Sequence, residues 1–121
     1  MRILIVDDND RVRRGVVAMV SAETGWKVCG EANNGADAIR KARELLPDLL
    51  LVDISMPDLS GLEVARLLRQ ELPQIKILVM SHHDPAQLLP RALEAGANAC
   101  LDKAYLHRDL LTIVGRMGEF Q

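Results

Sequence analysis

Aromatic side chains are scarce in this sequence, which has one Trp, one Tyr and one Phe among 121 residues. A hydrophobic core must therefore be built from Leu, Ile, Val, Ala and Met, and a chain of this length fits one domain. No apolar run approaches the roughly 20 residues that a bilayer-spanning helix needs. Acidic residues interrupt the first apolar run after a few positions, which argues against a signal peptide.

Neither an excess of basic charge nor a framework of cysteines is present. The chain has 15 Lys and Arg against 17 Asp and Glu, a net charge of −2, whereas a surface dedicated to nucleic acid needs a basic excess. The two cysteines, Cys29 and Cys100, form neither a disulfide framework nor a zinc-ligand pattern. We therefore expect two buried thiols in a reducing cytosol.

What the sequence does contain is a regular alternation of short apolar runs, typical of strands, with segments whose apolar residues recur at helical spacing. This alternation predicts right-handed crossovers and a parallel sheet with helices on both faces, an α/β fold. Five strands are predicted, at 3–6, 27–31, 49–52, 75–80 and 97–101. Five helices are predicted, at 12–20, 38–46, 61–72, 85–95 and 106–117.

Details of these segments give further expectations. The run at 49–52 is the most apolar and should lie in the centre of the sheet, whereas 27–31 has the mixed polarity of an edge strand. Leu46 is expected on the inner face of the second helix. Three polar residues are expected to cap helices, namely Asp10, Ser60 and Asp84.

Polar side chains stand at the ends of four of the predicted strands. In an open parallel sheet, ligands bind beyond the carboxyl ends of the strands. These positions hold Asp7 and Asp8 after the first strand, Asp53 at the end of the third, Ser81 after the fourth, and Lys103, preceded by Asp102, after the fifth. We therefore expect three carboxylates, a hydroxyl and an ammonium group to gather on one rim.

Such a group of carboxylates is unfavourable without a counter-charge. Two like charges about 4 Å apart repel by roughly 4 kcal/mol at an effective dielectric constant of about 20. A divalent cation removes this repulsion, and a set of oxygen ligands favours Mg²⁺, which also accepts phosphate oxygens. Beside the cation, an aspartate carboxylate is able to attack phosphorus and form an aspartyl phosphate, with Lys103 supplying charge and Ser81 a hydrogen bond.

These motifs, in this order, resemble the receiver domain of two-component response regulators. They are Asp7-Asp8 after ILIV, DISMPDLSG at 53–61, Met80-Ser81, and GANACLDK ending at Lys103. The resemblance spans essentially the whole chain, so residues 1–121 are expected to form one receiver domain. It implies a doubly wound, flavodoxin-like fold with strand order 2-1-3-4-5. The local sequence looks most like regulators with a C-terminal LuxR/FixJ-type helix-turn-helix, an output domain that these residues do not include.

The resemblance also assigns roles to residues. Asp53 is the implied phosphoacceptor, Ser81 and Lys103 are implied to sense the phosphoryl group, and Mg²⁺ is implied to bind Asp7, Asp8, Asp53 and the backbone carbonyl of Ser55. The implied phosphodonor is a phosphohistidine on a sensor histidine kinase.

The implied function is a cytoplasmic signalling switch and not a metabolic enzyme. Such a domain catalyses only its own phosphorylation and a slow dephosphorylation. Phosphorylation shifts an existing conformational equilibrium and thereby controls an output such as transcription. Homodimerisation on phosphorylation is compatible with this function. DNA would be reached only through the output domain, and no membrane is involved.

Three positions depart from the family pattern, and Pro90 is unusual for another reason. Cys100 stands where the family often has Tyr or Phe as a partner of the hydroxyl switch, and His82 stands where a small residue is usual. Ala104 replaces a proline that often follows the lysine, so we expect a trans peptide bond there. Pro90 falls inside the fourth helix, so that the helix either begins near it or is kinked. We hypothesise that residues 82–90 are loosely held and move on activation.

Other readings stay open from the residues alone. Asp8-Asn9-Asp10 has the D-x-D pattern of haloacid-dehalogenase-like phosphohydrolases, although Val12 stands where Thr is expected. A nucleotide or flavin binder on the same fold lacks both glycine-rich phosphate motifs. A scaffold that acts without phosphorylation is a further alternative. The adjacent pair His82-His83 is a weak metal candidate, and His107 is expected on the surface.

Overall fold

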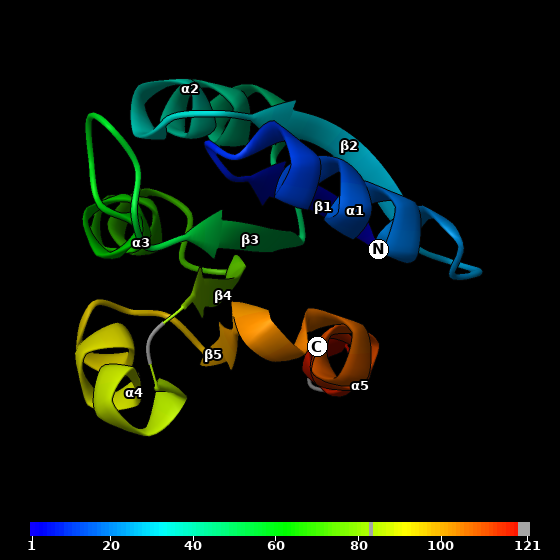
Figure 1. Ribbon diagram of the computed structural model, residues 1–121. Coiled ribbons are helices and arrows are strands. Elements are labelled where there is room, and N and C mark those ends of the chain that lie inside the picture. The colour runs from blue at the N-terminus through cyan, green and yellow to red at the C-terminus, as the bar shows by residue number, and fades with distance from the viewer. Residues whose placement is uncertain (83, 119–121) are drawn as a thin grey trace.

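The computed structural model describes residues 1–82 and 84–118, which form a five-stranded parallel sheet flanked by helices (Figure 1). The strand order is β2-β1-β3-β4-β5, which confirms the predicted doubly wound α/β fold. As predicted, β3 is central and β2 is an edge. The strands are β1 (Arg2–Val6), β2 (Lys27–Ala32), β3 (Leu49–Asp53), β4 (Lys76–Ser81) and β5 (Ala99–Asp102).

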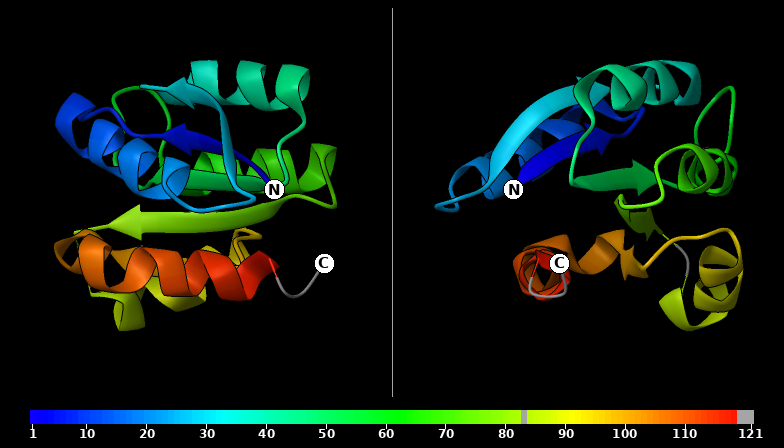
Figure 2. Two further views of the ribbon diagram at one scale, coloured as in Figure 1. Left: turned by 90° about the vertical axis from the view of Figure 1, so that its right-hand side faces the viewer. Right: turned by 180° about the vertical axis from the view of Figure 1, so that it is seen from behind.

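Helices cover both faces of the sheet. They are α1 (Asp10–Ser21), α2 (Gly35–Leu45), α3 (Gly61–Glu71), α4 (Pro85–Glu94) and α5 (Leu106–Gly118), with a short 3-10 turn η1 (Lys103–Tyr105) before α5. Helices α1 and α5 lie side by side on one face, and α2, α3 and α4 cover the other (Figure 2). Within the described ranges, no helix is both long and apolar enough to cross a membrane.

The sheet is apolar on both faces because successive residues of a strand point in opposite directions. In β1, Leu4 and Val6 join the core shared with α2, α3 and α4, whereas Ile3 and Ile5 join the core shared with α1 and α5. All four side chains are fully buried. Burial on both faces explains why the strand sequences are continuous apolar runs and do not alternate.

The start of α1 differs from the prediction. Ser60 caps α3 as expected, but α1 is capped by Asn9, whose Oδ1 accepts the Val12 N–H at 3.1 Å. Asp10 is already helical and pairs with Arg13 one turn later, at 2.7 Å. An aspartate is favourable both as a helix cap and in the first turn, where the helix dipole favours a carboxylate. The presence of Asp10 in the sequence therefore did not show which of these two positions it occupies.

Helix α4 begins at Pro85 after the predicted Asp84 cap, and Pro90 therefore lies in its interior. The alternative in which the helix begins near Pro90 is wrong. Because proline has no amide hydrogen, one backbone hydrogen bond of the helix is missing there. The mobility of residues 82–90 on activation stays a prediction, and His83 lies outside the described residues.

Three side chains that were expected inside are more exposed. Leu46 ends α2 in the left-handed conformation, with φ of 49°, and is 60% exposed. Cys29 and Cys100 are each only partly buried. Cys29 is the extra residue of an irregularity in β2 opposite Ile3 and Leu4. A β-bulge of this kind leaves no trace in an apolar pattern.

Candidate functional site

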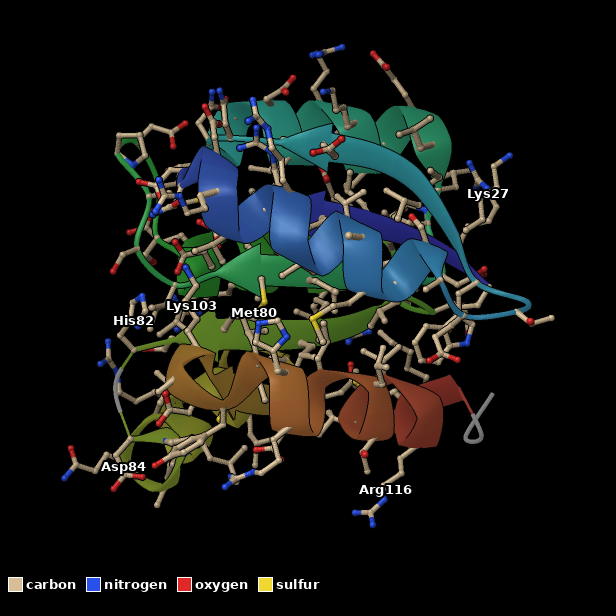
Figure 3. The ribbon with its side chains drawn as sticks, turned by 45° about the vertical axis from the view of Figure 1, so that its right-hand side comes forward. Lys27, Met80, His82, Asp84, Lys103 and Arg116 are labelled. Atoms are coloured by element: carbon tan, nitrogen blue, oxygen red, sulfur yellow. The ribbon has the colours of Figure 1, made fainter. Side chains whose placement is uncertain are left out.

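The register of the parallel sheet brings the predicted site residues together. Val6 at the end of β1 pairs with Val52 of β3, so Asp7 and Asp53, the next residues, lie at the same level. Lys103 directly follows β5 and lies at the same end of the sheet (Figure 3). We call the group of Asp7, Asp8, Asp53, Ser81 and Lys103 the acidic site.

The Lys103 ammonium lies between two carboxylates. Its Nζ is 2.7 Å from Oδ2 of Asp7 and 3.1 Å from Oδ2 of Asp53. Asp7 is fully buried, and Asp53 and Lys103 are 4% and 8% exposed. Ser81, predicted to follow β4, is its last residue and is buried. Buried charges need partners, and here one ammonium serves two carboxylates.

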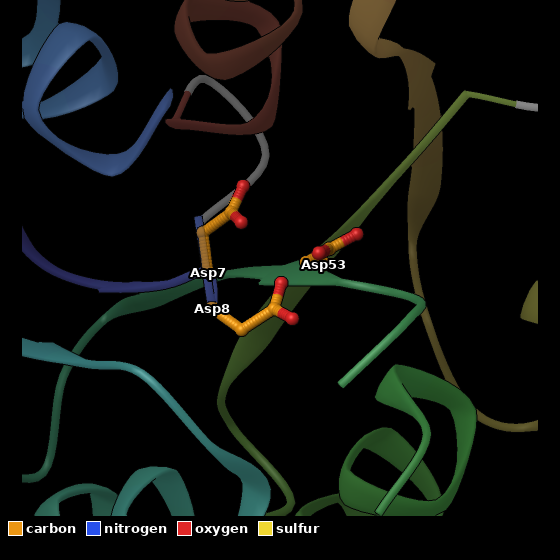
Figure 4. A group of neighbouring side chains, drawn as sticks. All are labelled: Asp7, Asp8 and Asp53. Atoms are coloured by element: carbon orange, nitrogen blue, oxygen red, sulfur yellow. The ribbon is translucent and has the colours of Figure 1, made fainter. Parts of the chain in front are cut away.

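Asp8 adds a third carboxylate to those of Asp7 and Asp53. One oxygen from each of Asp7, Asp8 and Asp53 lies within 4.8 Å of the others (Figure 4). Asp8 is exposed, which leaves the group open to solvent on that side. The buried Oδ2 of Asp7 accepts no hydrogen bond of standard geometry from the described residues and has only the ammonium beside it. An all-oxygen donor set with an unfilled acceptor fits a hard cation such as Mg²⁺.

The electrostatics of Asp53 reflect this crowding. The pKa of its carboxyl is raised from 3.8 to about 6, chiefly by burial and next by the nearby Asp7 carboxylate. The Lys103 ammonium and the Ser55 amide, which donates to Oδ1 at 3.3 Å, act in the opposite direction. Without a metal ion, the site therefore carries more negative charge than its own cation neutralises.

The loop after β3 explains the glycine of the DISMPDLSG motif. A Cβ on Gly61 would lie 2.4 Å from the carbonyl oxygen of Asp53, which is closer than atoms can approach. The Gly61 amide instead donates to the carbonyl of Ile54 at 2.8 Å. The loop therefore closes tightly behind Asp53 and returns the chain directly into α3, and a side chain at position 61 would push the strand end away.

Sequence reasoning missed Arg13. Its guanidinium donates to the backbone carbonyl of Asp7 at 2.8 Å and pairs with Glu31 of β2 and with Asp10. These contacts hold the turn that carries Asp7 and Asp8 against the neighbouring strand. The spacing of Asp10 and Arg13 on one helix turn was the available signal, but it did not indicate the contact with Asp7.

Several singled-out residues lie outside the acidic site. Asp102 caps η1 by accepting the Ala104 amide at 2.9 Å. Asp10 pairs with Arg13 and is not in the carboxylate group, so the D-x-D pattern of a phosphohydrolase is not assembled. His82 and His107 are exposed, the latter as predicted.

The structure shows what takes place at two of the positions where the sequence departs from the receiver pattern, Cys100 and Ala104. The Cys100 thiol donates to the carbonyl of Pro85 at 3.5 Å and so links β5 to the start of α4. The described residues contain no cis peptide bond, which confirms the trans bond expected before Ala104.

The fold and the acidic site match one protein family. Residues 3–115 match the response regulator receiver domain, and the chain therefore belongs to this family. It is 39% identical over 103 residues to the response regulator GacA of Pseudomonas viridiflava, covering 85% of this chain and 48% of that protein. The chain spans about half the length of the curated relatives it matches.

Solved structures of similar sequence have the same fold. The signal receiver domain of NarL from Mycobacterium tuberculosis superposes with a TM-score of 0.91 at 31% identity, covering 99% of this chain and 97% of that one. A LuxR-family two-component response regulator from an Aurantimonas species gives a TM-score of 0.81 at 31% identity, covering 94% and 84%. The resemblance to regulators of the LuxR type is thereby confirmed.

Proposed function

We propose that this chain is a phosphorylation switch in which Asp53 accepts a phosphoryl group in a Mg²⁺-dependent reaction. The observation that carries the proposal is the pair of buried carboxylates, Asp7 and Asp53, that shares the single ammonium of Lys103. A structural ion pair would balance these charges. Here the excess of negative charge is retained at considerable electrostatic cost, which supports a function that uses it.

Each residue of the acidic site has its own role in the proposed reaction. An Oδ atom of Asp53 attacks phosphorus, the bond from phosphorus to the donor imidazole nitrogen breaks, and the nitrogen keeps the electron pair. Lys103, now beside Asp53, contacts a phosphoryl oxygen and neutralises charge, and the Ser81 hydroxyl donates a hydrogen bond to another. In the slow dephosphorylation, water attacks phosphorus and gives up a proton to solvent, and the Asp53 carboxylate leaves, which releases phosphate.

Asp7, Asp8, Asp53 and the backbone carbonyl of Ser55 are the proposed Mg²⁺ ligands. When bound, Mg²⁺ neutralises the charge on the carboxylates and on the phosphoryl oxygens. Asp7 is fixed for this role because its Oδ1 accepts the Asn9 amide at 2.9 Å, which leaves Oδ2 for a cation.

Partners follow from the chemistry and from the relatives. The proposed phosphodonor is a phosphohistidine of a sensor histidine kinase in the cytoplasm. Because the curated relatives are about twice as long and a similar solved structure is that of a LuxR-family regulator, we propose transcription as the output, with DNA bound by a domain beyond these residues. Phosphorylation would shift this domain between two conformations, and dimerisation would be one consequence.

The test is a mass measurement of the intact protein after incubation with Mg²⁺ and a phosphodonor. Acetyl phosphate and a phosphorylated histidine kinase should both be used, because the exposed His82 beside the site affects a small donor more than a docked one. We expect one added phosphoryl group in the wild type and none in Asp53→Asn or with EDTA.

Asp102→Asn is the matched control, since Asp102 also ends a strand of the sheet, β5, but caps η1 and is not in the carboxylate group. We expect it to be phosphorylated like the wild type. Phosphorylation of Asp53→Asn, or incorporation that EDTA does not reduce, would overturn the proposal.

A further inference from the structure

The loop between β3 and α3, residues 54–60, carries Ser55, the proposed backbone ligand of the cation. Backbone hydrogen bonds fix both ends of the loop. The Ile54 amide donates to Met80 of β4 at 2.9 Å, and the Gly61 amide donates back to Ile54 at 2.8 Å. Ser55 itself is exposed. The position of its carbonyl therefore depends on what holds the middle of the loop.

Asp58 ties the middle of the loop to a different element, the N-terminus of α2. Its Oδ1 accepts the amide of Gly35 and its Oδ2 the amide of Ala36, each at 2.8 Å. Oδ1 also accepts the amide of Leu59 at 2.8 Å. The first amides of a helix have no partner within the helix, and a carboxylate there is favoured by the helix dipole. These bonds lower the pKa of Asp58.

The loop of residues 54–60 and the first turn of α2 are also in close contact. A Cβ on Gly35 would lie 2.7 Å from Cβ of Leu59. Glycine at the first position of α2 therefore lets the loop approach the helix closely enough for the bonds to Asp58. The side chains of Met56 and Leu59 pack against the core that α2, α3 and α4 share, so the contact is part of the folded loop and not an isolated surface bond.

We propose that Asp58 is a positioning residue for the metal site: by anchoring the loop to α2, it holds the Ser55 carbonyl where the cation binds. The inference rests on the proposed function, because it presumes that the acidic site binds Mg²⁺. A loop that is already ordered loses little conformational entropy when it becomes a ligand, whereas an untethered loop must be ordered during binding.

The coupling is reciprocal. If the anchored loop favours the cation, then the bound cation favours the anchored loop to the same degree. Mg²⁺ should therefore slow hydrogen exchange of the Gly35 and Ala36 amides, although both belong to α2 and neither belongs to the acidic site. This gives a measurement that does not depend on phosphorylation.

The test compares two ways of uncapping the same helix. Asp58→Ala removes the anchor and the cap. Asn34→Ala removes only a cap, because Asn34 accepts the amide of Asp37 at 2.8 Å, a bond that stays within the first turn of α2 and does not reach the loop of residues 54–60. Both variants and the wild type are titrated with MgCl₂ by calorimetry, after circular dichroism has established that each is folded.

We expect Mg²⁺ to bind Asp58→Ala about five- to tenfold more weakly than the wild type, and Asn34→Ala to bind within about twofold of the wild type. Asp58→Asn keeps one acceptor oxygen but turns an amide group toward Ala36, and its affinity should lie between the wild type and Asp58→Ala. The Mg²⁺-dependent protection of the Gly35 amide should be lost in Asp58→Ala.

The outcomes separate the two proposals. A wild type that does not bind Mg²⁺ overturns the proposed function and the inference together. A wild type that binds Mg²⁺, with Asp58→Ala equal to it or with Asn34→Ala equally weakened, overturns the inference alone. In that case Asp58 would only stabilise α2. Gly35→Ala provides a second approach, since it presses on Leu59 without touching a carboxylate, and it should also weaken Mg²⁺ binding.

Discussion

The two rims of the parallel sheet both gather polar side chains, but one rim satisfies their hydrogen bonds, whereas the other crowds like charges together. At the rim where strands begin, the Arg69 guanidinium donates to the carbonyls of Gly96 and Pro73 at 2.9 Å and to Oδ1 of Asn98 at 3.0 Å. The same Asn98 oxygen accepts the amide of Ile77 at 2.8 Å. Each of these donors meets an acceptor, and the result is a closed set of loop connections.

At the rim where strands end, the acidic site has three carboxylates and one ammonium within reach. The first rim uses polar groups to fasten loops, and the hydrogen bonds of the Arg69 guanidinium are all made to neutral acceptors. The second rim retains excess negative charge in a buried place, which costs stability. The difference teaches that a crowd of like charges distinguishes a functional rim from a structural one better than the number of polar residues does.

The largest effect is expected for Lys103→Met in the absence of metal. This change leaves two buried carboxylates without their cation, and breaking such a pair should lower the free energy of unfolding by about 3–5 kcal/mol. Mg²⁺ should recover much of the loss, because it binds the folded state between the same carboxylates. Urea denaturation at pH 7, with EDTA and then with MgCl₂, measures both.

Lys41→Met is the matched control for that change. Lys41 also pairs with a carboxylate, Asp37 at 3.0 Å, but both side chains are on the surface, where ion pairs contribute little. The loss of stability in Lys41→Met should be small, and it should not change when Mg²⁺ is added. Equal losses in the two variants, or a loss in Lys103→Met that Mg²⁺ does not change, would refute the contrast between the rims.

The next effect has the opposite sign. Asp53→Asn should raise the free energy of unfolding of the metal-free protein at pH 7, because it removes one crowded charge. The pKa of Asp53 is raised from 3.8 to about 6 in the folded chain. Between these two pH values, the folded state holds a proton that the unfolded state has released, so the stability of the wild type falls as pH rises.

The gain in Asp53→Asn should therefore be at most about 3 kcal/mol above pH 6, and it should shrink toward zero as pH falls to 4. Urea denaturation of both proteins in EDTA at pH 4, 5, 6 and 7 follows this difference. A gain that is independent of pH would contradict the explanation from ionisation, and a loss of stability at pH 7 would contradict the crowding itself.

Most of the fold could be predicted because its determinants are local. Continuous apolar runs as short as residues 49–52 favour a strand buried on both faces over a helix, and proline and glycine mark the ends of segments. The errors occurred where local patterns are degenerate. Asn9 and Asp10 are both good caps, so their order could not be decided from the residues, and the bulge at Cys29 depends on the pairing with β1.

The membership of the acidic site was predictable for a simple reason: in a parallel sheet, all strand ends that share a rim point the same way. Its surroundings were not. The contacts of Arg13 with the Asp7 carbonyl and of Asp58 with α2 join residues whose meeting depends on the packing of neighbouring loops. Such contacts follow from the register of the sheet, which the sequence pattern does not specify to the residue.

The smallest expected effect concerns the rim where the strands begin. Arg69→Gln should lower the free energy of unfolding by about 1–2 kcal/mol, since three acceptors lose a charged donor but partly regain water. Because Arg69 joins α3 to the turn before β5 at the far end of the sheet, its loss should leave the Mg²⁺ dissociation constant within about twofold of the wild type. Calorimetric titration and urea denaturation of the same sample give both values. A clear weakening of Mg²⁺ binding would show that the two rims are coupled through the sheet, and the distinction between a fastening rim and a reactive rim would no longer hold.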